Sequence, residues 1–439
     1  MITNEHKQIA RQAMDYALKH GCQSARISLQ NSTDTEFGTR QAELETLKQS
    51  SENSMTVELF VDGRYGNVTT NRINRKEIEG LIRNGIDSTR CLAEDPARTL
   101  PDPARYYTGG GDDLGQYDAS VADIDADTKV ALALDAAREI HGSDPHLVDV
   151  SSEYFDTLYH RYLLASNGFE GESSQSFVGI SCSASIKGEG DARPSAGWYE
   201  AAVGLDTLKR TDIGRTALTR ALRKLGQKKI ASGKYTMVLD NLNSLRMLSP
   251  LISAMSGGSI YRKQSFLIDK KGEQIAAPML TLMHDPHLKG VRGAAYFDGE
   301  GVRTEPGAII KDGVLQTYFI NTYFGNKLGM EPTYASPQVI TTPLGTKDLD
   351  GLVADVKRGI LVTGFNGGNS NSVTGDFSFG IEGFLIENGV LTQPVNEMNI
   401  TGNMLDLWQN LVAVGNDPRQ SNSWRIPSLV FEGVNFSGV

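Results

Sequence analysis

Apolar residues near the start of the chain change their spacing within a short distance. In residues 3–20 they recur every three to four positions, which predicts an amphipathic helix that ends at Gly21. The next stretch, ARISLQ, indicates a strand. Residues 37–70 contain alternating apolar and polar side chains, and the Asp62-Gly63 pair between two such runs predicts a β-hairpin.

Helical spacing returns twice before the middle of the chain, in residues 74–93 and 125–142. Residues 93–116 between them are rich in Pro, Gly and Asp, which is typical of a linker or surface loop. Strands follow, joined by a predicted turn at residues 166–168, and a further helix is expected over about residues 205–226. The first half of the chain therefore mixes helices with hairpins.

The chain changes character from Lys234 onward. It becomes Gly-rich, and strand–turn–strand units repeat around Asp312-Gly313 and Asn388-Gly389. Helices are short and not regularly interposed, which favours antiparallel sheets over a doubly wound parallel sheet. The predicted fold class is α+β, with a helix-containing N-terminal part that has hairpins and a Gly-rich, predominantly antiparallel β C-terminal domain.

One short helix of this region can be delimited from the stretch DLDGLVADVKRG. Asp348 is the expected N-cap, because its carboxylate can accept from the first free N–H groups. Lys357 and Arg358 are expected in the last turn, where cations complement the helix dipole. Gly359 is the expected end of the helix.

Length and composition indicate a globular protein of several domains. The chain has 439 residues, which is too long for a single ordinary hydrophobic core. Of these residues 39% are hydrophobic and 22% are charged, as in soluble globular proteins. Its longest apolar runs are strand-sized and its first residues do not form a secretory signal, so we expect a cytoplasmic protein without membrane contact. The expected domains are an N-terminal α+β domain at 1–115, a middle helix and strand domain at 116–230 and a β-rich domain at 231–439.

The net charge argues against a binding site for duplex DNA, and the cysteine positions argue against a structural zinc site. The formal net charge is −10, whereas proteins that bind duplex DNA usually present a basic face. The densest basic cluster, RTALTRALRKLGQKK, has helical spacing and is interpreted as a solvated helix face, so no direct nucleic-acid partner is expected. Cys22, Cys91 and Cys182 are far apart, which fits reduced thiols and argues against a structural zinc site.

Two histidines stand three positions apart in HDPHLKG. His284 and His287 could hold a metal, with Asp298 or Glu300 as a third ligand. Pro286 disfavours the helical backbone that would put both imidazoles on one face. The preferred interpretation is a polar loop, and an independent metallohydrolase that uses His284 and His287 is the alternative.

Two further segments allow both a structural and a functional interpretation. In YFDGEGVRTEP, Asp298 and Glu300 could act as general acid and base, but a turn whose acids bond loop amides is favoured. Residues 364–380, GFNGGNSNSVTGDFSFG, are either an ordinary loop or a groove-lining loop whose backbone binds an extended peptide. No P-loop, complete dinucleotide fingerprint or nucleophile elbow occurs in the chain.

Three long blocks in the second half of the chain carry a family resemblance. They are SAMSGGSIYRKQSFLIDKKGEQI, DPHLKGVRGAAYFDGEGVRTEPGAIIKDGVLQTYFINTYFGNKLG and VTGDFSFGIEGFLIENGVLTQPVNEMNITGNMLDLWQNLVAVGND. In this order and spacing they resemble the TldD/PmbA family, whose members have been called modulators of DNA gyrase. The resemblance covers nearly all of residues 234–437 and is weaker in VDGRYGNVTTNRI.

The resemblance implies a metallopeptidase built from two kinds of subunit. TldD-type members carry His-Glu-three residues-His on a helix and a later cysteine, whereas the PmbA type, also called TldE, lacks this zinc motif. In this chain the stretch is RMLSPLISAMSGG, where Ser249, Pro250 and Ala254 stand at or near the places of first histidine, glutamate and second histidine. No cysteine follows Cys182. The chain therefore resembles the PmbA/TldE side.

This resemblance implies a subunit with no catalytic residue and no cofactor of its own, acting in proteolysis of linear or unfolded peptides. A TldD-type partner would supply zinc in a heterodimer, and the chain alone could form a homodimer. The alternative from another class is a non-proteolytic regulatory protein, such as a gyrase-modulator-like adaptor. The residues expected to contact a peptide are Asp298, Glu300, Arg303, Thr374, Gly375, Asp376, Phe377 and Ser378.

Overall fold

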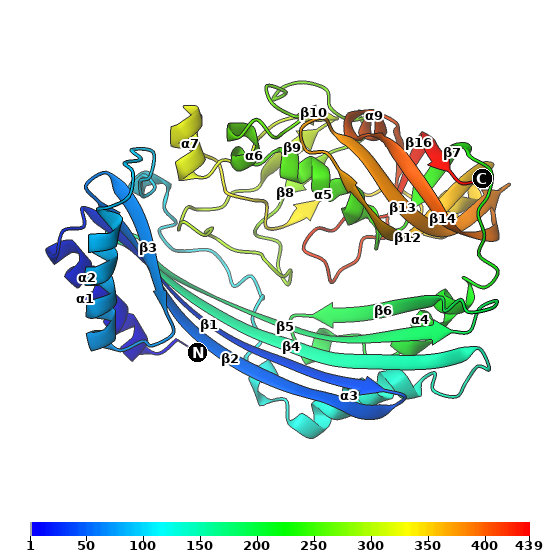
Figure 1. The fold of residues 1–439 in the computed structure, drawn as a ribbon, viewed down its shortest axis with the longest axis horizontal. Helices are drawn as coiled ribbons and strands as arrows, with labels where there is room; N and C mark the ends of the chain where they lie inside the picture. The colour runs from blue at the N-terminus through cyan, green and yellow to red at the C-terminus, as the bar shows by residue number, and fades with distance from the viewer. Residues whose placement is uncertain (1) are drawn as a thin grey trace.

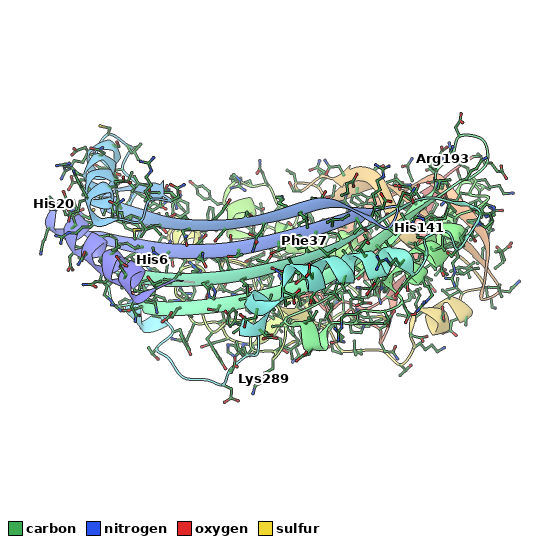
Figure 2. All side chains as sticks on the ribbon, turned by 90° about the horizontal axis from the view of Figure 1, so that it is seen from below. His6, His20, Phe37, His141, Arg193 and Lys289 are labelled. Atoms are coloured by element: carbon green, nitrogen blue, oxygen red, sulfur yellow. The ribbon has the colours of Figure 1, made fainter. Side chains whose placement is uncertain are left out.

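The computed structural model describes residues 2–439 and shows a long curved sheet with the C-terminal half along its concave side (Figure 1). Helices cover the outer side of this sheet (Figure 2). They are α1 (Asn4–Lys19) and α2 (Arg75–Thr89) near one end, and α3 (Ala126–Arg138) and α4 (Ile213–Leu222) near the other. Within the described residues, no helix combines the length and the apolar character needed to cross a membrane.

Six strands make up the long sheet: β1 (Ser24–Arg40), β2 (Glu43–Val61), β3 (Arg64–Thr70), β4 (Leu147–Ala165), β5 (Glu170–Ile186) and β6 (Ser195–Ala202). They lie in the order β3-β2-β1-β4-β5-β6, and all neighbours are antiparallel. β1 therefore pairs with the next strand in the chain on one edge and with the distant β4 on the other. One sheet thus contains strands from both segments 1–115 and 116–230.

Most of the elements expected in this half are confirmed. Helices α1, α2 and α3 lie where the apolar spacing predicts them. Asp62 and Gly63 join β2 to β3 with φ of 51° and 71°, the positive angles of a two-residue hairpin turn. The helix expected over about residues 205–226 is shorter than predicted. Asp212 has a left-handed φ of 67°, so the α-helix begins only at Ile213.

The two faces of β1 differ in burial. Odd-numbered residues such as Ala25, Ile27 and Leu29 are buried in a core with α1 and α2, as the two-residue period of a strand requires. Even-numbered residues such as Arg26 and Ser28 lie on the concave face and are only partly buried. A second core joins α3 and α4 to β4, β5 and β6. The concave face is therefore free to present polar side chains to the C-terminal half.

The C-terminal half is built on a second six-stranded sheet. Its strands are β7 (Gly233–Leu239), β12 (Arg358–Ser370), β13 (Asp376–Glu387), β14 (Val390–Asn403), β15 (Leu411–Val414) and β16 (Leu429–Ser437). The order is β14-β13-β12-β7-β16-β15, and an additional β14–β16 pairing curls the sheet toward a barrel. Among the pairings of the described residues in this sheet, only β7–β12 is parallel. The predicted α+β class with a predominantly antiparallel C-terminal part is confirmed.

Shorter elements complete this half and pack with the second sheet around the largest core of the molecule. The remaining strands are β8 (Leu282–His284), β9 (Gly307–Lys311), β10 (Val314–Leu315) and β11 (Ile340–Thr341). The remaining α-helices are α5 (Ser244–Ala254), α6 (Gly257–Tyr261), α7 (Thr322–Leu328), α8 (Leu349–Ala354) and α9 (Met404–Gln409). Short 3₁₀ turns lie at Pro103–Arg105, Ala119–Asp123 and Leu205–Thr207.

Helix α8 shows where the sequence-based boundaries hold and where they are wrong. Asp348 is its N-cap, as predicted. Lys357 and Arg358 lie beyond its end, and Gly359 belongs to β12. A Cβ at position 359 would lie 2.5 Å from the carbonyl oxygen of Thr236 on β7. Gly359 therefore permits close pairing of two parallel strands and does not end a helix.

Candidate functional site

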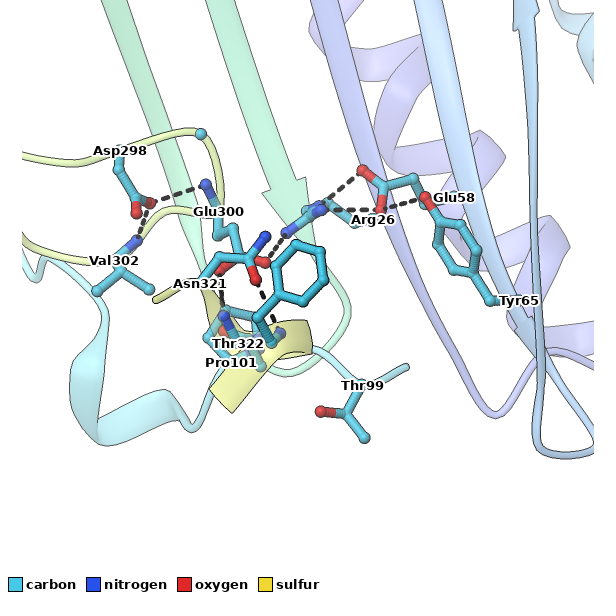
Figure 3. Close-up of polar contacts among 12 residues, drawn as sticks. Arg26, Glu58, Tyr65, Thr99, Pro101, Asp298, Glu300, Val302, Asn321 and Thr322 are labelled. Atoms are coloured by element: carbon cyan, nitrogen blue, oxygen red, sulfur yellow. Dashed lines mark hydrogen bonds and ion pairs between the residues drawn. The ribbon is translucent and has the colours of Figure 1, made fainter. Parts of the chain in front are cut away.

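A polar network joins the concave face of the long sheet to the loop at residues 298–303 (Figure 3). Oε2 of Glu300 accepts hydrogen bonds from the backbone N–H and the hydroxyl of Thr322, at 3.0 and 2.9 Å. Oε1 of Glu300 lies 3.8 Å from Nη1 of Arg26 on β1. Arg26 in turn donates to both carboxylate oxygens of Glu58, at 2.9 and 2.8 Å. Glu300 is thus held between the two halves of the chain.

Asp298 closes the turn that carries Glu300. Its Oδ1 accepts from the backbone N–H groups of Glu300 and Val302, at 2.8 and 3.1 Å, and Gly301 has a φ of 85°. Burial, followed by the charge of Glu300, raises the pKa of Asp298 to about 6, although the two N–H donors oppose this shift. The turn interpretation of this segment is confirmed, and each carboxylate has its own set of partners.

Arg303 and its neighbour Val302 border a cavity. The cavity has a volume of about 390 Å³ and is also lined by Arg105 and Tyr334. Nε of Arg303 donates to Glu305 at 2.8 Å, and its Nη1 donates to the carbonyl oxygen of Ala104 at 2.7 Å. Of the three candidate side chains in this segment, Arg303 is the one that lines this cavity.

The two histidines of HDPHLKG have separate partners. His284 is fully buried at the end of β8, stacks on Tyr334, and its Nε2 lies 2.6 Å from Oε1 of Gln338. Burial lowers its pKa to about 4, so the ring is neutral at pH 7. His287 lies in the turn after β8 and contacts Thr304, at 3.1 Å from Nε2 to Oγ1. The described residues contain no group of three or more His, Cys, Asp or Glu side chains arranged to hold a metal.

The turn at residues 374–378 is satisfied by its own side chains and by β14. Oγ1 of Thr374 donates to Asp376 at 2.7 Å, and Nδ2 of Asn403 donates to the carbonyl oxygen of Thr374 at 2.8 Å. Phe377 is buried, while Ser378 is exposed on β13. β13 pairs with β12 on one edge and β14 on the other through this stretch. Because strand addition needs an unpaired edge, the expected main-chain binding of a peptide at residues 376–378 does not fit this geometry.

Gly375 is required by the turn itself. Its φ is 82°, and a Cβ there would lie 3.2 Å from the ring of Phe266 and 3.3 Å from the side chain of Asn403. A β-branched residue at this position would therefore test the fold and not peptide contact. Segments 298–303 and 374–378 also have different neighbours, so the predicted site residues do not form one cluster.

Helix α5 occupies the stretch compared above with a zinc-binding helix. Ser249 is exposed, and its hydroxyl donates to the carbonyl oxygen of Leu245 at 2.8 Å. Pro250 follows inside the helix, which continues to Ala254. Ala254 is 1% exposed and belongs to the largest core. Positions 249 and 254 thus face solvent and protein interior, respectively.

Comparison with known proteins places the whole chain in one family. Profiles of the PmbA/TldA metallopeptidase match residues 25–89 as domain 1, residues 119–225 as the central domain and residues 232–438 as the C-terminal domain. The chain belongs to the PmbA/TldD family. The resemblance seen in the C-terminal blocks of the sequence is thereby confirmed and extends into the N-terminal half.

Relatives of this PmbA/TldD family member span its full length. A metalloprotease PmbA homolog of Haemophilus influenzae is 29% identical, over 99% of this chain and 96% of its own. The metalloprotease PmbA of Escherichia coli is 26% identical over 94% and 92%. The crystal structure of a proposed modulator of DNA gyrase from Bacteroides thetaiotaomicron is 55% identical, with a TM-score of 0.98 and 100% coverage of both chains. TldE of Thermococcus kodakarensis shares the fold, with a TM-score of 0.88 at 19% identity over 98% and 100%.

A PmbA/TldD metallopeptidase implies a metal ion, and the side chains of α5 do not fit one. Protein ligands of zinc are imidazole, thiolate and carboxylate groups. Ser249, Pro250 and Ala254 carry none of these groups, and Ala254 is turned into the core. These three positions of α5 therefore provide no ligand set for zinc.

A feature that the sequence interpretation missed is a cavity of about 410 Å³ between α4 and the second sheet. Arg220, Arg223 and Lys224 line it, and the solvated-face interpretation of RTALTRALRKLGQKK is wrong for Arg220 and Lys224, which pair with Asp240 and Glu382. The sequence did contain a signal for this cluster, because residues three and four positions apart lie on one face of a helix.

Proposed function

We propose that this chain is the zinc-free, PmbA/TldE-type subunit of a cytoplasmic, two-subunit metallopeptidase that acts on linear or unfolded peptides. The observation that carries the proposal is the composition of α5, where Ser249, Pro250 and Ala254 provide neither metal ligand nor general base. Hydrolysis of an amide near neutral pH needs an activated water and stabilisation of a developing oxyanion. A TldD-type partner supplies the zinc and the base in this proposal.

The contribution of this chain is to position the peptide and exclude water. The polar concave face of the long sheet and the loop with Arg303 are the surfaces suited to this role, because their side chains can bond an extended backbone. The contacts of Glu300 with Arg26 and Thr322 support a positioning role for the loop over acid–base chemistry. Residues 374–378 support the local fold in the same proposal.

Three samples test the proposal: this chain, a TldD-type partner, and both proteins co-expressed. Each sample is assayed on one unstructured peptide, and its zinc content is measured by elemental analysis. We expect co-purification as a heterodimer, about one zinc per pair, and full cleavage only in the mixed sample. Metal-dependent cleavage by this chain alone, or zinc that is lost in His284→Ala or His287→Ala, would overturn the proposal.

A second candidate is a non-proteolytic regulator, which the name of the 55% identical relative favours. Purified gyrase is assayed for DNA supercoiling with this chain alone and with the mixed complex. Inhibition by this chain without the partner would favour the regulator. Unchanged supercoiling together with peptide cleavage by the complex would favour the peptidase subunit. The size of the isolated chain in solution decides whether it forms a homodimer when no partner is present.

A further inference from the structure

The cavity between the end of α4 and the second sheet is not used by the site described above. Its lining comes from β6 and the end of α4 on one side, and from β12, β13 and Asp240 after β7 on the other (Figure 1). Its volume of about 410 Å³ falls in the range of small-molecule sites. The cavity thus has the size and the position, between two separately built layers, of a ligand site.

Charges in the cavity are arranged as two internal pairs and one free cation. Nη2 of Arg220 lies 3.3 Å from Oδ2 of Asp240, and Nζ of Lys224 lies 2.5 Å from Oε1 of Glu382. Arg223 is exposed, and its guanidinium has no hydrogen-bond or ion-pair partner in the part of the chain that the structure describes. Three cations against two carboxylates leave one positive charge, which sits on Arg223.

The two pairs are fixed, so they do not compete for Arg223. Asp240 is 2% exposed, and its Oδ1 also accepts from the backbone and the side chain of Asn243, at 3.1 and 2.6 Å. Lys224 donates in addition to the carbonyl oxygen of Ser195, at 2.6 Å. The carboxylates of Asp240 and Glu382 are therefore neutralised in place, and the guanidinium of Arg223 is left available.

The remaining lining combines apolar walls with hydroxyl groups. Leu242, Leu361 and Phe384 supply the apolar surface. Ser183 and Thr363 also line the cavity, and their hydroxyls make no side-chain hydrogen bond within the described residues. A ligand that satisfies this lining has an apolar group for the walls and an anionic oxygen pair for the guanidinium.

We propose that this cavity binds a monovalent carboxylate attached to an apolar group, with Arg223 as the residue that recognises the carboxylate. A guanidinium binds the two carboxylate oxygens in a fork, which fits one singly charged anion. Phosphate carries more than one negative charge at neutral pH, which is more than the single unpaired cation of this lining can balance, so it is disfavoured. The carboxylate can belong to the C-terminus of a short peptide or to a free acylated amino acid.

Calorimetric titration of the purified full chain tests the proposal with matched probes. They are N-acetyl-leucine, N-acetyl-leucine amide, a tripeptide ending in leucine with a free or an amidated C-terminus, and inorganic phosphate. We expect the two carboxylates to bind and both amides to bind at least tenfold more weakly. Tighter binding of N-acetyl-leucine would indicate a free acylated amino acid as the ligand, and tighter binding of the tripeptide would indicate a peptide C-terminus. Equal binding of acid and amide, or tighter binding of phosphate, would overturn the proposal.

Variants assign the binding to this cavity. Arg223→Gln should weaken carboxylate binding at least tenfold, and Arg223→Lys should recover part of it because the charge remains without the fork. Arg83→Gln is the matched control, since Arg83 is exposed on α2, lies outside the cavity and has no partner in the described chain. Unchanged binding in Arg223→Gln would place the ligand elsewhere and overturn the assignment. Because Arg223 is exposed and unpaired, its replacement should leave the melting temperature unchanged, and this is checked first.

Discussion

Nζ of Lys129 lies 2.6 Å from Oδ2 of Asp156, and both side chains are buried, at 8% and 2% exposure, where α3 covers the long sheet. The hydroxyl of Tyr154 also donates to Oδ2, at 2.8 Å. Breaking one side of a buried ion pair leaves the other charge without compensation, which typically costs about 3–5 kcal/mol. Asp156→Ala should therefore lower the free energy of unfolding by about that amount, measured by urea denaturation.

The control for this pair is the double variant Lys129→Met with Asp156→Leu. Replacing both charges with apolar side chains removes the uncompensated ammonium, so most of the lost stability should return. A double variant no more stable than Asp156→Ala would contradict the charge-based explanation and point to packing.

Glu300 should matter more as an acceptor than as a charge. Glu300→Gln keeps an oxygen for Thr322 and loses only the 3.8 Å attraction to Arg26, so a change below about 1 kcal/mol is expected. Glu300→Ala leaves the Thr322 N–H without its acceptor and should cost about 1–3 kcal/mol. Denaturant unfolding of both variants measures the difference, and equal losses would show that the ion pair dominates.

Because His284 is buried as a neutral ring, the folded chain should lose stability as the pH falls below 6.5. Its pKa is about 4 in the folded chain, below the ordinary value of 6.5, so the unfolded chain binds the proton more readily. The effect is absent above pH 6.5, grows as the pH falls from 6.5 toward 4, and reaches about 3 kcal/mol. Unfolding free energies at pH 8 and pH 5 should therefore differ less in His284→Gln than in the natural chain.

The pH dependence that Asp298 gives to the free energy of unfolding must be separated from that of His284, because the two have opposite signs. Its pKa is raised from 3.8 to about 6, so its contribution is lost as the pH rises through this interval. Measuring His284→Gln in an Asp298→Asn background isolates the histidine. An identical pH profile with and without His284 in that background would contradict the prediction.

A metal-binding side chain at position 254 should destabilise the folded chain. Ala254 is 1% exposed in the largest core, so Ala254→His should overpack that core and lose about 1–3 kcal/mol. Ser249→His on the exposed face of α5 should be nearly neutral. Thermal unfolding compares the two variants, and equal melting temperatures would show that α5 can still accept a zinc ligand at both places.

Local signals in the sequence were sufficient for much of the fold. The Asp62-Gly63 pair predicts its hairpin because both residues must adopt positive φ, a property of the turn alone. The N-cap of α8 at Asp348 is equally local, since its carboxylate bonds the backbone N–H of Gly351 at 2.9 Å. Such elements depend on neighbours within a few positions.

Features set by distant partners could not be predicted in this way. Gly359 has the residue type that ends a helix, but its place is decided by Thr236, more than one hundred positions away. Lys224 belongs to a stretch with the spacing of a solvated helix face, but it pairs with Glu382 of the second sheet. The contact between Glu300 and Arg26 is likewise invisible in either segment alone. A single sequence gives the spacing of such residues but not the surface that meets them.

The place of β1 between β2 and β4 has a consequence for the newly made chain. β1 can pair with β2 as soon as both leave the ribosome, but its other edge waits for β4, as the pairing of Arg26 with Ala165 shows. At ordinary rates of synthesis that wait lasts on the order of ten seconds. During it, a strand of 17 residues exposes a free edge, which is a template for unwanted pairing. We therefore expect nascent chains halted between β2 and β4 to expose this edge to other chains and to benefit from a chaperone that covers it.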